Sequence, residues 1–104
     1  MTYQVLVDPE AEVDLTAAFE WYEEQVNGLG HEFLVSVRAS LERLERVPLS
    51  NQTILADVRR GKLKRFPFGI FYVVRDEKVH VIGFMHSRRD HGEWQVRRKK
   101  VVLR

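Results

Sequence analysis

The sequence predicts a single α+β domain in which a helical hairpin packs on a mainly antiparallel sheet, in the order β-α-α-β-β-β. Two observations support this prediction. Between Pro9 and Val47, apolar residues recur at steps of three and four, which is the period of helices. From Asp57 onward they form short alternating or continuous stretches, which are typical of strands. The 104 residues suit one domain, residues 1–104, and contain no repeat or linker.

The first helix is expected to follow a short β-prone strand at Tyr3–Val7. Asp8 can accept hydrogen bonds from the free amides of the first helical turn. Pro9 suits the first helical position because its missing N–H has no helical partner. The apolar stripe of this helix is Ala11, Leu15, Ala18, Tyr22 and Val26. Asn27-Gly28 ends the helix, because both residues tolerate a left-handed backbone.

A second helix is expected from Gly30 to Val47, where Pro48 stops it. Its apolar stripe is Phe33, Leu34, Val37, Leu41, Leu44 and Val47. The connection 27–30 is so short that the two helices must lie antiparallel, as a hairpin.

Three strands are predicted at Val58–Phe66, Ile70–Arg75 and Lys78–His86, followed by a basic tail. The turns between them are tight, so these strands are antiparallel neighbours. The sequence leaves open which strand lies beside residues 3–7. Both faces of the strands are rather apolar. One face should therefore receive the helical hairpin, and the other should be a partly exposed concave surface or a partner contact.

Charge is distributed unevenly along the chain. Residues 1–50 carry three arginines against ten acidic residues, a net charge of −7, whereas residues 51–104 carry fourteen Lys and Arg against five acidic residues, a net charge of +9. The overall charge of +2 therefore hides a strong separation. A basic surface fixed on a sheet suits an anionic partner, either a polynucleotide or an acidic peptide.

Composition narrows the classes of protein that this sequence can represent. The chain has no cysteine, and His31, His80, His86 and His91 lack the spacing of metal ligands, so we expect neither a metal nor another cofactor. No apolar run approaches the roughly 20 residues of a membrane span. The N-terminus lacks a basic leader followed by an apolar stretch. These features favour a cytoplasmic protein with no membrane association.

The strand predicted at Val58–Phe66 holds the main binding candidates: Arg59, Arg60, Lys62, Lys64 and Arg65. Alternation along a strand would place Arg59 and Arg65 on one face, and Lys62 and Lys64 on the other. Two interpretations are open. The cluster could bind an anionic partner, or it could be a solvated strand whose lysines discourage edge pairing.

His86 is the candidate base for RNA cleavage. Cleavage of RNA by its own 2′-hydroxyl needs a base, an acid for the leaving oxygen, and cations on the phosphate. Arg65, Arg88 and Arg89 could supply the cations, and Tyr72 could lend a hydroxyl. The other interpretation is a structural histidine at the end of a strand. An aromatic residue in a central strand is usually core, and we expect this of Tyr72.

Trp94 and Arg97 could together form a stacking platform for a base. The interpretation that we favour is an anchor that holds the basic tail on the sheet. Trp21 and Tyr22 are expected to lie in the core, at the hairpin contact.

Several segments follow one another in an order known from a toxin family. The first half contains Asp8-Pro9-Glu10-Ala11-Glu12 with Asp14-Leu15, then Trp21-Tyr22, then Gly28-Leu29-Gly30 with Phe33. The second half contains Arg59, Lys64-Arg65-Phe66-Pro67-Phe68, Ile70-Phe71-Tyr72, and His86-x-Arg88-Arg89-Asp90 with Trp94 and Arg97. Together, over residues 3–97, they resemble RelE/ParE superfamily toxins of bacterial type II toxin–antitoxin, or plasmid stabilisation, systems. The resemblance implies the fold predicted above.

The family divides by activity, and this chain resembles its ParE-like branch more closely. RelE-like members cut mRNA in the ribosome, whereas ParE-like members are not nucleases and poison DNA gyrase. The resemblance also places His86, Arg88 and Arg89 where nuclease members carry catalytic groups. It places Lys62, Lys64 and Arg65 where those members hold RNA phosphates. His91 stands where a proline often follows Arg-Arg-Asp, which leaves the path of the tail open.

Three functions therefore remain open: a gyrase-binding toxin without chemistry of its own, a ribosome-dependent endoribonuclease, and a non-toxic nucleic-acid-binding or interaction domain. The resemblance implies a cognate antitoxin that binds through an acidic and apolar segment in a hetero-oligomer. The residues expected to bind a partner or target are Arg59, Lys62, Lys64, Arg65, Arg88, Arg89, Trp94 and Arg97.

Overall fold

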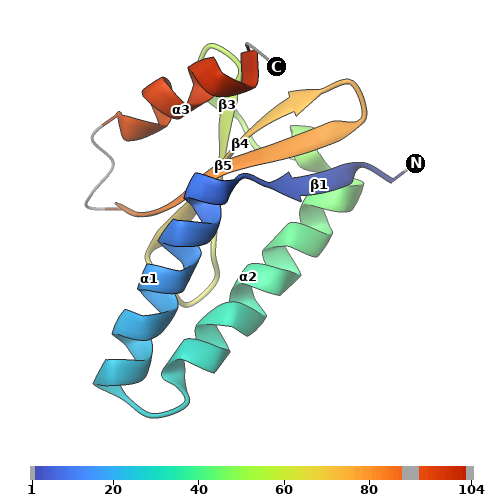
Figure 1. Ribbon diagram of the computed structural model, residues 1–104. Coiled ribbons are helices and arrows are strands. Elements are labelled where there is room, and N and C mark those ends of the chain that lie inside the picture. Colours follow the sequence, from blue (N-terminus) through green and yellow to red (C-terminus); the bar gives the residue numbers. More distant parts are fainter. Residues whose placement is uncertain (1, 88–91, 103–104) are drawn as a thin grey trace.

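The computed structural model describes residues 2–87 and 92–102, and within them five strands form one sheet between helices (Figure 1). The elements are β1 (Gln4–Val7), α1 (Pro9–Gln25), α2 (Leu29–Arg46), a 3-10 turn η1 (Pro48–Ser50), β2 (Thr53–Leu55), β3 (Val58–Lys62), β4 (Phe68–Arg75), β5 (Lys78–His86) and α3 (Glu93–Val102). The predicted α+β class is confirmed, whereas η1, β2 and α3 are additions to the predicted order. None of the helices described is long and apolar enough to cross a membrane.

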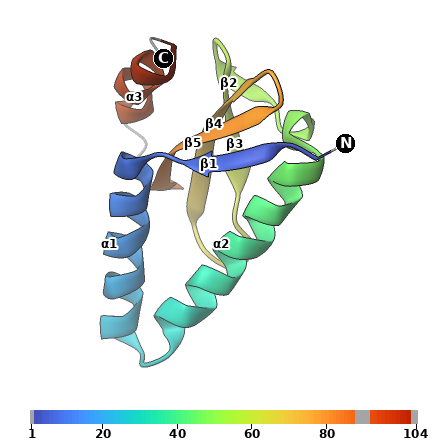
Figure 2. The ribbon, with the colours of Figure 1, turned by 45° about the vertical axis from the view of Figure 1, so that its right-hand side comes forward.

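The strands lie in the order β1-β5-β4-β3-β2. β3, β4 and β5 are antiparallel neighbours, as their tight turns predict. The neighbour of β1, which the sequence left open, is β5, and the two run parallel with Gln4 opposite Lys78. β1 thus lies across the open end of the V formed by α1 and α2 (Figure 2).

The predicted hairpin of α1 and α2 turns at Gly28, whose φ of 91° favours a residue without a side chain. Gly30 allows the two helices to approach closely, because a Cβ there would lie 2.7 Å from the carbonyl oxygen of Phe19. The predicted capping by Asp8 is wrong in one respect. Asp8 occupies the N-cap position, but among the described residues its carboxylate makes no capping hydrogen bond.

The larger core lies between the hairpin and the sheet. Its centre is a group of rings from both helices, from the β3–β4 connection and from the start of β4: Tyr22, Phe33, Phe66 and Phe68. The centroids of Phe33 and Phe66 lie 5.4 Å apart in an edge-to-face arrangement. Such ring pairs add stabilisation beyond the apolar area that they bury. Tyr22 is buried as predicted, but Trp21 is 57% exposed, so its predicted core position is wrong.

A second, smaller core lies on the opposite face, where α3 covers the sheet. Trp94 stacks on Phe71 with ring centroids 6.0 Å apart. The other buried members of the cluster are Val58, Val73, Ile82, Met85 and Val101. The prediction that the sheet face opposite the hairpin is partly exposed is therefore wrong for the area beneath α3. Sequence periodicity hid this helix because Arg97, rather than an apolar residue, occupies an inward position between Trp94 and Val101.

The strand predicted at Val58–Phe66 is shorter than expected and ends at Lys62. Arg65 has a φ of 73°, which breaks the extended backbone, and Leu63 and Phe66 both turn into the larger core. The alternation expected to place Arg65 on the face of Arg59 therefore fails beyond residue 62.

Candidate functional site

Arg59 uses its guanidinium within the protein. It lies on β3 opposite Tyr72 of β4. Its Nη1 donates to the carbonyl oxygens of Asn51, at 2.5 Å, and of Leu49, at 3.3 Å. Arg59 therefore fixes the segment between α2 and β2, while part of the residue remains accessible to a partner.

Tyr72 is a core residue, as expected. Its side chain is fully buried, and its hydroxyl donates to the carbonyl oxygen of Pro48 at 2.5 Å. Asn51 Nδ2 donates to the same hydroxyl at 3.1 Å. Burial raises the pKa of Tyr72 above its ordinary value. A buried hydroxyl with these partners holds the 48–51 segment and is poorly placed to reach a substrate.

The end of β5 and the β3–β4 connection bring Arg65 and His86 to the same end of the sheet. His86 lies opposite Phe68 in the strand register, and their rings meet edge to face at 5.4 Å. The Ser87 N–H donates to the carbonyl oxygen of Pro67. The Arg65 guanidinium contacts Glu32 Oε1 of α2 at 2.9 Å and lies 5.7 Å from the centre of the Phe66 ring. Tyr72 is four residues farther along β4, about 13 Å away by strand rise.

Lys62 and Lys64 are exposed, at the end of β3 and in the connection that follows. Lys64 is tied to the hairpin through its backbone, because Ser36 Oγ donates to its carbonyl oxygen at 2.9 Å. Arg88, Arg89 and His91, which the sequence also singled out, lie outside the described residues.

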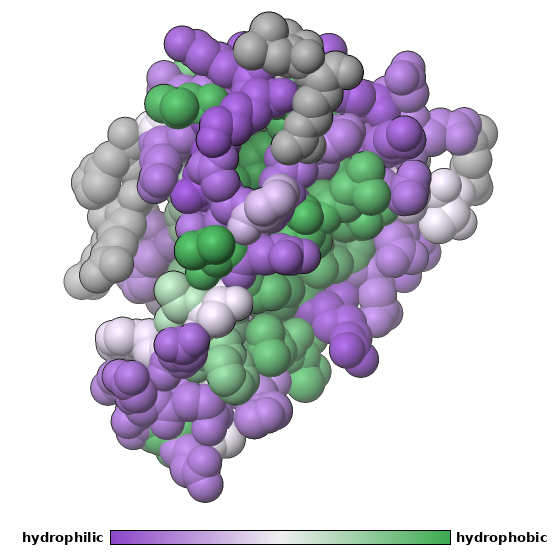
Figure 3. Space-filling view, in the orientation of Figure 1, coloured by the Kyte–Doolittle hydropathy of each residue, from purple (hydrophilic) through white to green (hydrophobic). Residues whose placement is uncertain are grey.

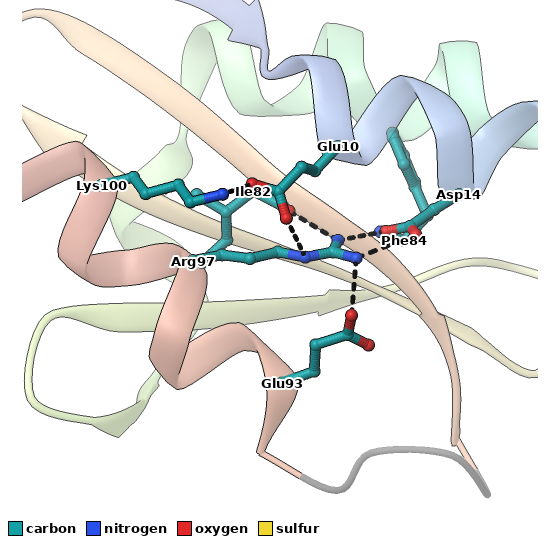
Figure 4. A network of polar contacts seen from close by, with 7 residues as sticks. All are labelled: Glu10, Asp14, Ile82, Phe84, Glu93, Arg97 and Lys100. Atoms are coloured by element: carbon teal, nitrogen blue, oxygen red, sulfur yellow. Dashed lines mark hydrogen bonds and ion pairs between the residues drawn. The ribbon is translucent and has the colours of Figure 1, made fainter.

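Arg97 lies at the centre of a buried polar network (Figure 4). Its Nη1 and Nη2 contact the two carboxylate oxygens of Asp14 at 2.5 and 3.2 Å, and Nη1 also donates to the carbonyl oxygen of Ile82 at 3.0 Å. Glu93 and Glu10 contact the same guanidinium. The hydrogen bond to Asp14 raises the pKa of Arg97, although burial opposes this.

Beyond the end of β1, the Arg97 network supplies hydrogen-bond partners to the backbone at the edge of β5. β1 ends at Val7, and the Asp8 N–H donates to the carbonyl oxygen of Val81. Beyond this point Arg97 binds the Ile82 carbonyl, and Asp14 accepts the Phe84 N–H at 3.1 Å. Gly83 leaves room for this pair, because a Cβ there would lie 3.0 Å from Arg97 Nη1.

Asp14 is the important site residue that sequence reasoning overlooked. Asp14 stands three residues after Ala11, within the inward-facing stripe of α1. A carboxylate at such a position indicates a buried cationic partner. The structure therefore places Trp94 and Arg97 together as an anchor for α3, and it buries both side chains.

Two further contacts tie α3 to the rest of the molecule. Lys100 pairs with Glu10, and its hydrogen bond lowers the pKa of that carboxyl. Arg98 and Arg75 both contact Asp57, at 2.5 and 3.2 Å. Burial opposes ionisation of Asp57, but the hydrogen bonds from Arg98 and from its own backbone N–H, together with the charges of Arg98 and Arg75, outweigh it and lower the pKa.

An apolar band is visible on the hairpin side of the molecule, between α1 and α2 and below β1 (Figure 3). Half-buried apolar side chains of these elements include Val5, Val7, Leu15, Leu34 and Leu41. Together with exposed cations on β3 and the β3–β4 connection, this band gives the protein two kinds of contact surface. In the described residues, no group of three or more His, Asp or Glu side chains could hold a metal ion.

Comparisons with known proteins agree with this architecture. The chain is similar to a solved structure described as the chromosomal ParDE TA system from P. aeruginosa, with a TM-score of 0.73 and 16% sequence identity over 82% of this chain and 96% of that chain. This likeness establishes the class of fold. The family model of the ParE toxin of the type II toxin–antitoxin system, parDE, matches residues 5–91. The chain therefore belongs to the ParE toxin family. No curated protein matches it.

Proposed function

We propose that this ParE-family toxin acts by binding DNA gyrase, without chemistry of its own, and that a cognate antitoxin neutralises it. The observation that carries the proposal is the position of the groups suggested for nuclease chemistry. The Tyr72 hydroxyl is buried against Pro48, and the Arg65 guanidinium is directed to Glu32. Both groups would have to leave these partners to meet a scissile phosphate.

The antitoxin is proposed to bind both kinds of surface that the protein offers. The apolar band between α1 and α2 suits an apolar segment, and the exposed Lys62 and Lys64 suit acidic side chains. Opposite charges on the two partners would speed and orient their association. The expected product is a hetero-oligomer in the bacterial cytoplasm, where gyrase and ribosomes are found.

The direct test is a supercoiling assay with purified protein and bacterial gyrase. We expect inhibition of supercoiling that the antitoxin reverses, and no cleavage of mRNA on translating ribosomes. Absence of gyrase inhibition, together with message cleavage, would overturn the proposal in favour of the RelE-like function.

The second candidate, a ribosome-dependent endoribonuclease, is favoured by one observation. His86 stands at the same end of the sheet as the basic connection that carries Lys64 and Arg65. His86→Ala separates the candidates, with His31→Ala as the matched control because the His31 side chain is 74% exposed on α2. Gyrase toxicity predicts that both variants stay toxic. Loss of toxicity in His86→Ala alone, with antitoxin binding intact, would indicate catalysis.

A third possibility is a non-toxic nucleic-acid-binding or interaction domain with the same fold. Inducible expression of the chain without its antitoxin tests it. Arrested growth is expected for a toxin, and normal growth at confirmed expression would favour the non-toxic domain.

A further inference from the structure

One side of α1 faces solvent and carries apolar side chains. Val13, Ala17 and Trp21 stand four residues apart, so they form one stripe along the helix. All three are exposed, Val13 by 69% and Trp21 by 57%. Figure 2 shows α1 at the margin of the molecule, with α2 on its other side. Leu15 of the apolar band stands two residues from both Val13 and Ala17, so the stripe lies on the opposite side of the helix from that band.

Carboxylates surround this stripe. Glu12, Glu20 and Glu24 are exposed, and α1 contains no lysine or arginine. None of these three carboxylates forms an ion pair with another described residue. Glu10 and Asp14 of the same helix, in contrast, both contact Arg97. The outer side of α1 is therefore an apolar surface with an uncompensated negative rim.

Glu20 and Glu24 stand where they weaken the helix. They lie one turn apart, so their like charges repel each other. They also lie near the C-terminal end of α1, which is the negative end of the helix dipole, and the last turn holds no basic residue. Glu23 is stabilised instead, because its carboxylate accepts the Gly30 N–H at 2.8 Å. A cation supplied by a partner would relieve this repulsion, and local features that cost stability are expected at functional sites.

The apolar stripe and the negative rim together define the chemistry of the partner. A tryptophan surrounded by weaker contacts is typical of the centre of a protein–protein interface. A second copy of this chain, bound through the same face, would bring carboxylates against carboxylates. An anionic membrane surface would repel them as well. The stripe therefore suits a protein surface that offers both apolar side chains and cations.

We propose that the outer face of α1 contacts a cationic surface of DNA gyrase, an inference that rests on the function proposed above. The face consists of Val13, Ala17, Glu20, Trp21 and Glu24. An enzyme that holds DNA carries clusters of lysine and arginine, so gyrase offers the charge that this face lacks. Trp21 supplies the apolar anchor, and the two carboxylates orient the approach of the partners. The surfaces proposed for the antitoxin lie elsewhere on the molecule.

The test measures the binding of full-length variants to immobilised bacterial gyrase by biolayer interferometry. Trp21→Ala should weaken binding by about tenfold or more, as expected of a central aromatic anchor. Val35→Ala is the matched control, because Val35 is an exposed apolar residue of α2, and its effect should stay within about twofold. Both side chains are exposed, so the fold should survive the changes.

Glu24→Lys tests the charge separately. It should slow association with gyrase and reduce the salt dependence of the rate, because it replaces an attraction by a repulsion. It should also raise the melting temperature of the toxin, since it removes the repulsion with Glu20 and suits the helix dipole. A merely structural role would lower binding and stability together. Glu42→Lys, the same change at an exposed residue of α2, should leave the association rate within about twofold.

The outcomes separate this inference from the proposed function. If the wild-type protein does not bind gyrase, the proposed function and this inference both fail. If the wild-type protein binds and Trp21→Ala and Glu24→Lys bind equally well, only the inference fails. Equal losses in the two control variants would overturn it in the same way. Sedimentation equilibrium examines the other occupant: a dimer of the wild-type protein that Trp21→Ala dissociates would assign the face to a second copy and overturn the choice of gyrase.

Discussion

On one face of the sheet, α1 and α2 bury a cluster of aromatic rings around Phe33. On the other face, α3 buries Trp94 and Val101 and is further held by ion pairs of Arg97, Arg98 and Lys100. The hairpin therefore depends mainly on apolar burial, which is insensitive to pH and salt, apart from the Glu23 carboxylate at its turn, whose pKa is lowered by hydrogen bonds from the backbone of Gly28 and Gly30. The attachment of α3 depends on charges, most of which are partly exposed. The two faces should thus respond differently to the same perturbation.

The largest effect is expected on the hairpin face. Phe33 is fully buried, and Phe33→Ala should lower the free energy of unfolding by about 3–5 kcal/mol through lost burial and a residual cavity. Urea unfolding followed by circular dichroism measures the change. Val35→Ala, an exposed position on the same helix, should change stability by less than about 0.5 kcal/mol. A loss below about 2 kcal/mol for Phe33→Ala would mean that the rings repack.

The next effect is expected on the α3 face. Arg97→Met leaves the carboxylate of Asp14 without its main cation, and we expect a loss of about 2–3 kcal/mol because a half-buried charge then lacks an ionic partner. Adding Asp14→Asn should restore part of this loss, since an amide oxygen can still accept the Phe84 N–H. If the double variant is no more stable than Arg97→Met, the half-buried charge is not the cause.

Acid should release α3 from the sheet before it unfolds the hairpin. The folded protein lowers the pKa of Glu10 and Asp57, so the unfolded chain binds more protons in acid. Their stabilising contacts are present above about pH 4 to 5 and are lost as the pH falls through the lowered values. In a Trp21→Phe background, Trp94 fluorescence should report release of α3 before the hairpin loses helical circular dichroism. Asp57→Asn should weaken this acid step, and a single coincident transition would contradict the distinction.

The smallest effects concern exposed ion pairs. Arg98→Gln should cost up to about 1 kcal/mol, because Arg98 and Asp57 are only partly exposed. Arg65→Gln should cost less than about 0.5 kcal/mol, because both Arg65 and Glu32 are largely exposed. Urea titrations at low and high salt measure both, and salt should reduce the first effect. An equal cost for the two substitutions would remove the distinction between the α3 contacts and ordinary surface pairs.

The sequence was informative wherever local periodicity determines structure. The stripes of α1 and α2, the turn at Asn27-Gly28, and the β4–β5 hairpin depend on neighbouring residues, and the structure contains them. Val26 and Val47, the last members predicted for the two stripes, are wrong, because each lies just beyond its helix and is exposed. The partner of β1 could not be predicted, because parallel pairing with β5 depends on how a distant segment returns. α3 was missed because its inward-facing stripe contains a charged residue, Arg97, whose carboxylate partner Asp14 comes from α1.

The candidate site was predictable only in part, for a related reason. Trp94 could be recognised as an anchor because it is a large apolar side chain in a basic tail. Such a ring is expected to be buried against the sheet. The order of residues along the chain did not reveal that the extended backbone of β3 ends before Arg65. It also did not reveal that the Tyr72 hydroxyl donates a hydrogen bond to Pro48.

The pairing of the first strand with the last, and of Asp14 with Arg97 across 83 positions, has a consequence for biosynthesis. β1 and α1 leave the ribosome long before the segments that complete them exist. Contacts between such distant parts of a chain form late, after the local hairpins. The nascent chain therefore has no finished sheet until β5 and α3 have been synthesised, and a product truncated before β5 cannot assemble the domain.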